Sequence, residues 1–317
     1  RTQSAASGWW CVDCSTIPMT RRQRWWIQVL LLAAVLALAG ILLNNLTVNL
    51  IRTGLGLSFR WLSRPAGFAI SEHLLPFQPG DSMAWALLMG WLNSLRVIAC
   101  SIALATVLGV VAGAASRSNN PLFSALAGLF VGLIRQIPLL LQLLFWYFVA
   151  FLGLPSEPLA PLGALIRVSN QAISVMGLNL SVEFAAVLVG LSVFTGASIA
   201  EVVRGGLDAV PRGQWEAFRS LGIGEGLGLK RVVLPQALPA ILPALSSQYL
   251  NLAKNSTLSI AVGYADLYAV SDTAITQTGR AIEGFLLLLF SFLLLNLLIN
   301  GSMQILNHSV LNKGQRT

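Results

Sequence analysis

Long apolar stretches alternate with shorter polar segments along this chain. A helix needs roughly 20 apolar residues to cross the hydrocarbon core of a membrane, and six stretches reach or approach that length. Each is expected to span the membrane, so the pattern predicts an all-α integral membrane protein with about six transmembrane helices. The predicted spans are Trp26–Leu43, Ala84–Ala115, Leu122–Ala150, Val182–Ala200, Leu234–Leu252 and Ala281–Leu306.

Prolines predict that two of these helices are irregular. Pro138 lies in the third span, where it is expected to kink or open the helix because proline lacks a backbone N–H. Pro235, Pro239 and Pro243 recur at a spacing of four in the fifth span, which is therefore expected to bend.

Composition agrees with a membrane protein. Of 317 residues, 56% are hydrophobic and only 10% are charged, whereas soluble domains carry about 25% charged residues. The formal net charge of +8 is also found in nucleic-acid-binding proteins, but basic residues gather in the cytoplasmic loops of membrane proteins. We therefore expect membrane lipid around the spans and no nucleic-acid partner.

The distribution of lysine and arginine predicts the direction of the spans. If the N-terminus is cytoplasmic and all six spans cross, twelve of these residues lie inside and five outside. This asymmetry follows the positive-inside rule. It places both termini and the segment 201–234 in the cytoplasm.

The first span has two interpretations. Three arginines precede Ile27–Leu36, and Ala37-Leu38-Ala39 follows it, as in a signal peptide with its cleavage site. The apolar run continues to Leu43. This favours a retained anchor helix at 26–43, preceded by a cytoplasmic tail at 1–25.

Two long segments, 44–83 and 151–181, lie on the outer side in this topology. Loops of such length are usually functional or loosely ordered. They form either a platform for an external binding protein or a simple covering over the helix ends, and both alternatives stay open.

The largest charged island, Glu201–Ala237, is expected to contain a short helix outside the bilayer. Pro211 suits the first turn of a helix, and Gly222 suits the position just after its end, where a left-handed backbone is needed. Such a helix either fits a groove on another protein or packs on its own bundle, and amphipathicity alone favours the second alternative. The apolar stripe consists of Trp215, Phe218 and Leu221, and the residues spaced for pairing are Arg212, Glu216 and Arg219.

The spacing within this island resembles that of a known loop. Glu216-Ala217, Gly222, Val232 and Leu234-Pro235 match the pattern E-A-A, three residues, G, nine residues, I-x-L-P. The pattern resembles the cytoplasmic loop by which permease subunits of ATP-binding-cassette (ABC) importers bind their ATPase partners. Phe218 departs from it at the third position of the triplet. The full spacing favours the groove-binding alternative for the helix, in which Trp215, Phe218 and Leu221 form the face presented to the ATPase.

Other segments are similar to the polar amino-acid permeases of this class, and the resemblance covers Ala84–Leu306. The outer stretch Arg60–Phe77 is similar to the general L-amino-acid permease branch. The segments that carry the similarity to the wider family are Ala200–Leu207, Val210–Gln214, Lys254–Leu258, Val262–Tyr268 and Ile134–Leu143.

The resemblance implies the transmembrane domain of a type I importer, with a permease core at 84–306, a coupling loop at 201–235 and a cytoplasmic tail at 307–317. It also implies that the helix in this loop couples the translocation path to ATPase subunits in an alternating-access cycle. The implied coupling residues are Pro211, Trp215, Glu216, Ala217, Phe218, Leu221 and Gly222.

The same resemblance implies a multi-pass protein of the bacterial cytoplasmic (inner) membrane. Its implied partners are two ATP-binding subunits, a second permease subunit that is identical or paralogous, and an external binding protein that delivers an amino acid. ATP and Mg²⁺ would be bound by the ATPase subunits. The chain has no G-x-x-x-x-G-K-[ST] motif to bind phosphates, so we expect neither enzymatic activity nor a cofactor of its own.

Polar residues inside the predicted spans are candidates for the substrate path, because such groups usually face the bundle interior or water. Arg135, with Gln142 seven residues later on the same face, is suited either to a substrate carboxylate or to an ion pair with Glu201 or Glu183, and the ion pair is favoured. For the remaining candidates, helix packing and interhelical hydrogen bonding are favoured over substrate binding. These candidates are Thr195, Ser198 and Asn296.

Two other functions have less support. A secondary transporter or channel needs intramembrane acids for ion coupling, but Glu183, Glu201 and Glu283 lie near span ends. An integral membrane enzyme would need paired carboxylates, a metal cluster or an activated nucleophile. Cys11 and Cys14 supply only two of the four ligands that zinc prefers, so no metal site is expected.

Overall fold

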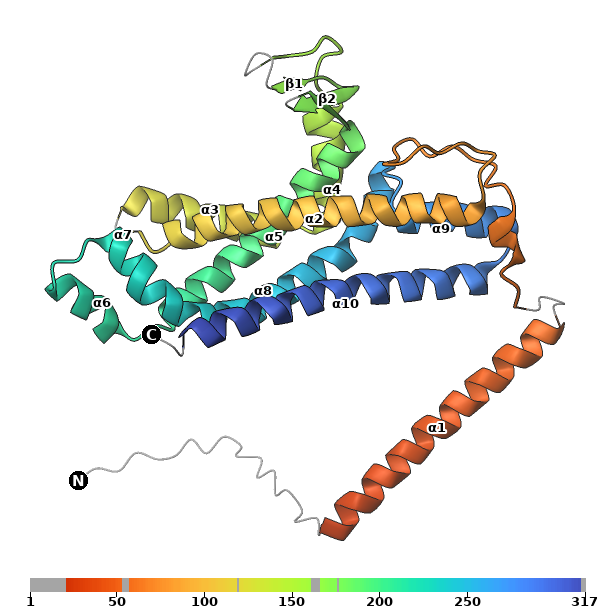
Figure 1. Ribbon diagram of the computed structural model, residues 1–317, viewed down its shortest axis with the longest axis horizontal. Helices are drawn as coiled ribbons and strands as arrows, with labels where there is room; N and C mark the ends of the chain where they lie inside the picture. Colours follow the sequence, from red (N-terminus) through yellow and green to blue (C-terminus); the bar gives the residue numbers. More distant parts are fainter. Residues whose placement is uncertain (1–20, 53–56, 119, 161–165, 176, 315–317) are drawn as a thin grey trace, which may run out of the picture. The chain divides into compact units, whose positions relative to one another are not determined.

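The computed structural model describes residues 21–52, 57–118, 120–160, 166–175 and 177–314. Cys11 and Cys14 therefore lie outside the described residues. The chain divides into two compact units, Arg1–Ser58 and Phe59–Thr317. In the first unit, helix α1 (Arg21–Arg52) is long and apolar enough over Trp25–Asn49 to cross a membrane (Figure 1). This helix extends beyond the predicted first span at both ends.

The second unit is a bundle of long helices joined by shorter ones (Figure 1). Within the described residues, four helices including α1 are apolar and long enough to cross a membrane. The number is five if α3 and the segment Leu139–Phe151 count together as one bent span. A span was also predicted at Leu234–Leu252. Helix α8 there has 22 residues, but it is less apolar than the four helices above and does not meet the criterion. The helices are η1 (Arg60–Ser63), α2 (Met83–Ala115), α3 (Pro121–Gln136), α4 (Leu139–Leu144), η2 (Phe145–Phe151), α5 (Val182–Asp208), α6 (Arg212–Ser220), α7 (Glu225–Gly228), η3 (Leu229–Val233), α8 (Leu234–Asn255), η4 (Ser256–Val262), α9 (Leu267–Thr278) and α10 (Ala281–Gly314).

The third predicted span is broken rather than continuous. Its two parts, Pro121–Gln136 and Leu139–Phe151, meet at an angle of 105°. The break falls at Ile137, whose backbone is extended, because the following Pro138 disfavours the helical conformation in the residue before it. The prediction that Pro138 opens this helix is confirmed.

Helices α2 and α5 pack closely because small residues line their contact. A Cβ atom added at Gly109 would lie 2.5 Å from Cβ of Ile199, and one at Gly113 would lie 2.7 Å from Cβ of Val203. A Cβ atom added at Gly196 would lie 3.1 Å from Cβ of Leu108. The favoured packing role of the small-residue patch that contains Thr195 and Ser198 is therefore confirmed.

The segment 59–82, which belongs to the first of the two predicted outer segments, packs tightly against the bundle. Trp61, Ile70 and Phe77 are buried in one apolar cluster with residues of α2 and α9. Glu72 forms an ion pair with Arg96 of α2 at 2.5 Å and accepts a hydrogen bond from the hydroxyl of Ser181. The segment thus covers helix ends, while its use as a platform for a binding protein stays a prediction.

The second predicted outer segment contains a small antiparallel sheet that the all-α prediction did not include. Its strands β1 (Ile166–Val168), β2 (Ala172–Val175) and β3 (Leu178–Ser181) pair in sequence order, with Ile173 opposite Leu180. The sheet stands beyond the end of α4, at the start of α5 (Figure 1). The strands have at most four residues each, too few for an alternating pattern to stand out in the sequence.

Candidate functional site

The predicted short helix of the charged island is α6, and its ends agree with the sequence pattern. Pro211 is the N-cap, one residue before the first turn in which it was expected. After Leu221, Gly222 adopts φ +71°, and its N–H donates to the carbonyl oxygen of Arg219 at 2.9 Å. Glycine takes this left-handed conformation without a steric penalty, so the helix ends where the sequence predicts.

The apolar stripe of α6 does not face a single direction. Phe218 is 1% exposed and belongs to the core of its own chain, and Trp215 packs partly against that core. Leu221 is 77% exposed. The interpretation that all three residues form a surface presented to another protein is therefore wrong, because two of them anchor α6 to the bundle.

Tight contact with α7 holds Phe218 in place. A Cβ atom added at Gly228 would lie 2.3 Å from Cδ2 of Phe218, so the ring occupies the space that any larger side chain would need. The exposed side of α6 is formed instead by Arg212, Gly213, Glu216, Ala217 and Ser220, followed by Leu221.

Charges around α6 pair differently from the prediction. Arg219 donates from Nε to Glu225 of α7 at 2.8 Å rather than pairing with Glu216. Its guanidinium also lies 5.8 Å from the ring centre of Trp215. The faces of aromatic rings attract cations at such distances. Arg219 therefore links α6 to α7 and also interacts with the ring of Trp215.

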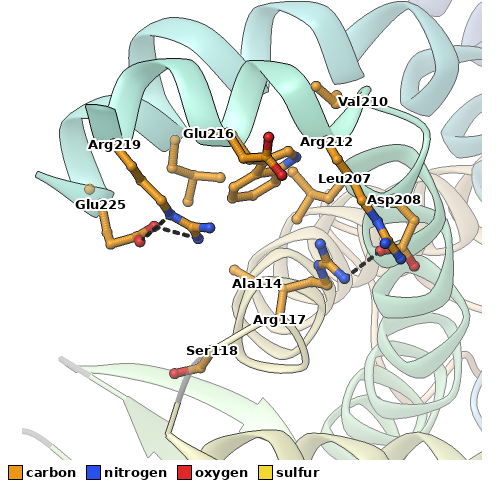
Figure 2. Close-up of a pocket in the computed structure, with 13 residues that line it drawn as sticks. Ala114, Arg117, Ser118, Leu207, Asp208, Val210, Arg212, Glu216, Arg219 and Glu225 are labelled. Carbon is orange, nitrogen blue, oxygen red and sulfur yellow. Dashed lines mark hydrogen bonds and ion pairs between the residues drawn. The ribbon is translucent and has the colours of Figure 1, made fainter. Parts of the chain in front are cut away.

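A cavity of about 970 Å³ lies between α6 and the ends of α2 and α5. Figure 2 shows Arg117 and Asp208 reaching toward each other on the side of the cavity opposite Glu216. Arg117 pairs with Asp208 at 2.8 Å, and its guanidinium lies 5.5 Å from the ring centre of Trp215. The charged residues on the cavity wall are Arg117, Asp208, Arg212, Glu216, Arg219 and Glu225.

A second cavity, of about 530 Å³, lies between α3 and α5 and contains Arg135 in its wall. Arg135 lies 3.7 Å from the carboxylate of Glu201, which confirms the ion pair favoured from the sequence. Glu201 also pairs with Arg204 at 2.9 Å. The other proposed partner, Glu183, instead accepts a hydrogen bond from the hydroxyl of Tyr147 at 3.3 Å.

Gln142 does not share a face with Arg135, because the break at Pro138 turns α4 away from α3. Its side-chain amide donates to the carbonyl oxygens of Ile134 and Ile137, at 2.8 and 3.0 Å. These are carbonyls that a continuous helix would have paired with backbone N–H groups. Gln142 therefore closes the break rather than pointing at a substrate.

The remaining substrate-path candidates do not converge on either cavity. Thr195 is buried within α5, and Ser198 donates to the carbonyl oxygen of Phe194 one turn before it. Asn296 is half-buried on α10, and its Oδ1 has no hydrogen-bond partner among the described residues. Across the described part of the chain, no group of three or more His, Cys, Asp or Glu residues is arranged to hold a metal ion.

Sequence reasoning missed Arg117 and Asp208 as members of the site around α6. Arg204 and Asp208 are four residues apart on α5, a spacing that does predict their pairing at 3.2 Å. Arg117 lies in the turn just after the end of α2, far away in the sequence, so no local spacing could connect it to Asp208 or Trp215.

Comparisons with known proteins agree on one kind of protein. Residues 105–312 match the family described as the binding-protein-dependent transport system inner membrane component. The chain is 33% identical to the putative amino-acid ABC transporter permease protein YhdX of Escherichia coli, over 90% of this chain and 93% of that protein. It is 32% identical to the general L-amino acid transport system permease protein AapQ of Rhizobium johnstonii, over 81% of this chain and 84% of that protein.

Solved structures show a similar fold. One is the crystal structure of an amino acid ABC transporter with histidines, to which the chain is similar with a TM-score of 0.57 and 24% identity, over 71% of this chain and 94% of that one. Another is an inward-facing MetNI methionine ABC transporter, with a TM-score of 0.56 and 22% identity, over 72% of this chain and 97% of that one. At these identities the likeness concerns the arrangement of the helices.

Proposed function

The chain belongs to the family of binding-protein-dependent transport system inner membrane components, and on that premise we propose that it is the permease subunit of an ATP-driven amino-acid importer. The amino-acid substrate is inferred from relatives that are named as amino-acid permeases. Family membership favours this function over a secondary transporter or channel without an ATPase partner. In the proposal, partner subunits bind ATP and Mg²⁺ and hydrolyse the ATP, and this chain has neither a cofactor nor an ATPase site.

The construction of α6 carries the coupling part of this proposal. Phe218 anchors the helix from inside, while Glu216, Ala217 and Leu221 are exposed on the other side. A short helix that is packed against its own chain on one face and exposed on the other can transmit a displacement as a rigid body. In this proposal Trp215 supports the helix from below, and Pro211 and Gly222 set its length.

The proposed assembly contains two ATP-binding subunits, a second permease subunit that is identical or paralogous, and an external substrate-binding protein. The chain is proposed to lie in the bacterial cytoplasmic membrane with both termini in the cytoplasm, which puts α6 on the side where ATP is available. Support for this direction comes from the excess of lysine and arginine in the segments assigned to the inside.

Replacing Gly222 by Asp tests the coupling role. The change introduces a side chain and a charge where the backbone has φ +71°, so it disturbs the end of α6. We expect uptake of labelled L-amino acids and substrate-stimulated ATP hydrolysis to be lost, while membrane insertion and the amount of folded chain stay normal. Full retention of uptake would overturn the proposal.

Gly224→Asp is the matched control. Gly224 is exposed, has an extended backbone with a φ of −60° and is the N-cap of α7, a position at which aspartate is favoured. This variant adds the same charge two residues away without strain, so it should keep uptake. A second readout is co-purification of ATP-binding subunits with the chain, which a self-sufficient transporter would not show.

A further inference from the structure

Charged side chains around the two cavities form one continuous series of contacts. Glu201 lies between Arg135, at 3.7 Å, and Arg204, at 2.9 Å. Asp208 lies between Arg204, at 3.2 Å, and Arg117, at 2.8 Å. Charges alternate along the whole series, and each carboxylate is shared by two guanidinium groups. We call this series the charge ladder, and its members are Arg135, Glu201, Arg204, Asp208 and Arg117.

The two ends of the charge ladder lie at functionally different places. One end, Arg135, is in the last turn of α3, next to the break at Pro138. The other end, Arg117, reaches the ring of Trp215 on α6 with its guanidinium 5.5 Å from the ring centre. Figure 2 shows this second end, where Arg117 joins Asp208 beneath α6.

We propose that the charge ladder transmits the position of α6 to the break between α3 and α4, with Arg117 and Asp208 as positioning residues. The proposal rests on the proposed function, because it assumes that ATPase subunits move α6. A shift of α6 changes the position of the Trp215 ring relative to the guanidinium of Arg117. Arg117 in turn competes with Arg204 for the carboxylate of Asp208. Arg204 in turn competes with Arg135 for Glu201, so the change reaches the broken span.

The cavity beneath α6 is the reason why this route matters. The helix packs on α7 and η3, whereas about 970 Å³ of space separates it from the ends of α2 and α5. Across that space the guanidinium of Arg117 reaches the ring of Trp215. A displacement of α6 therefore acts on α2 through this contact rather than through close helix packing.

Static stabilisation is a weak explanation for the ladder. The exposed fractions of its side chains run from 33% for Glu201 to 51% for Arg135, and exposed ion pairs contribute only about 0–1 kcal/mol each. A set of independent surface pairs would give small and additive effects. A transmitting series would instead behave as one unit, so that breaking it anywhere interrupts it.

A double-mutant cycle between distant members of the ladder separates these two outcomes. Arg117 does not contact Glu201, and Glu201 is seven residues, or roughly 10 Å of helix, from the Asp208 that Arg117 does contact. Residues this far apart normally have additive effects. The variants are Arg117→Gln, Glu201→Gln and the double variant, each assembled with the ATPase subunits, the second permease and the binding protein in liposomes.

Uptake of a labelled mixture of L-amino acids per ATP hydrolysed is the quantity to measure. We expect each single variant to lower this ratio about five-fold or more, and the double variant to be no lower than the worse single one. If the effects of the two single variants multiply in the double variant, or if the ratio stays at the wild-type value, the proposal is contradicted. Asp272→Asn and Arg167→Gln, at exposed positions outside the ladder, are controls that should keep the wild-type ratio.

A second pair of variants keeps the test valid if the glutamine variants fail to assemble. Trp215→Leu removes the ring that Arg117 faces, and Trp215→Phe retains a ring. The ladder predicts a lowered ratio for leucine and a nearly normal one for phenylalanine, and equal ratios would contradict it. If the wild-type chain binds no ATPase subunit, the proposed function itself fails, which is a separate outcome from a normal wild type with additive variants.

Discussion

The ring of Phe218 occupies the space in front of Gly228, where a Cβ atom would lie only 2.3 Å from the ring. Phe218 is also the residue that departs from the E-A-A triplet in the loop pattern. The bulky side chain and the glycine therefore compensate each other across α6 and α7. This contact explains how the loop accommodates phenylalanine at a position where the pattern has alanine.

Gly228→Ala should destabilise the α6–α7 contact by overpacking, which typically costs about 1–3 kcal/mol. Phe218→Ala should destabilise it by leaving a cavity, by about 3–5 kcal/mol. The double variant should lose less than the sum of the two, because the new methyl group enters space that the ring has vacated. Thermal unfolding of the purified complex in detergent measures all three.

Gly226→Ala is the control for this pair, since an added Cβ there meets no atom within 4 Å. It should leave the unfolding midpoint close to that of the wild type. Strict additivity of Phe218→Ala and Gly228→Ala would show that the two positions do not compensate each other.

Gln142→Leu should destabilise the break in the third span. The substitution leaves the carbonyl oxygens of Ile134 and Ile137 without the donor that now lies 2.8 and 3.0 Å away. The two hydrogen bonds are partly buried, and a typical intramolecular hydrogen bond contributes about 0.5–1.5 kcal/mol, so the unfolding midpoint should fall. Gln136→Leu, at an exposed position of α3, should have little effect, and an equal loss in both variants would argue against the capping role.

Leu221→Asp should weaken the binding of ATPase subunits. Leu221 is 77% exposed at the end of α6, so a change there alters the presented surface without disturbing the core. The amount of ATPase that co-purifies with the chain should fall, while the chain itself stays folded. Leu178→Asp is the matched control, because Leu178 is 70% exposed on β3 of the small antiparallel sheet, and an identical loss there would rule out a local effect.

Asp266 should make stability depend on pH. Burial raises the pKa of this carboxyl to about 7, although its Oδ1 accepts a hydrogen bond from the N–H of Ala269. In the unfolded chain the group loses its proton near its ordinary pKa of 3.8. Between these values the folded state holds a proton that the unfolded state has lost, so stability should fall as pH rises from about 4 to about 7 and level off above that.

Asp266→Asn tests this sign, since the amide oxygen can still cap α9 but cannot ionise. The fall in unfolding midpoint between about pH 5 and about pH 8 should be smaller in this variant than in the wild type. Asp272→Asn, on the exposed face of α9, should retain the wild-type dependence. Stability that rises with pH in the wild type but not in Asp266→Asn would contradict the raised pKa.

Local patterns in the sequence predicted the parts of the fold that depend on local chemistry. The ends of α6 follow from Pro211 and Gly222, because the ring of proline and the missing side chain of glycine act within one turn. Apolar length predicted α2, α5 and α10, and Pro138 predicted the opening of the third span. The angle of 105° was not predictable, because it depends on packing against other helices.

The sequence by itself determined that this chain is a helical membrane protein with a short helix, of known spacing, outside the spans. Only the tertiary structure decided which way each side chain of that helix points. It buried Phe218, exposed Leu221 and brought Arg117, from the turn after α2, close to the ring of Trp215. The physical reason is that hydrophobic periodicity and turn chemistry act over a few residues, whereas contacts between helices depend on how the whole bundle packs.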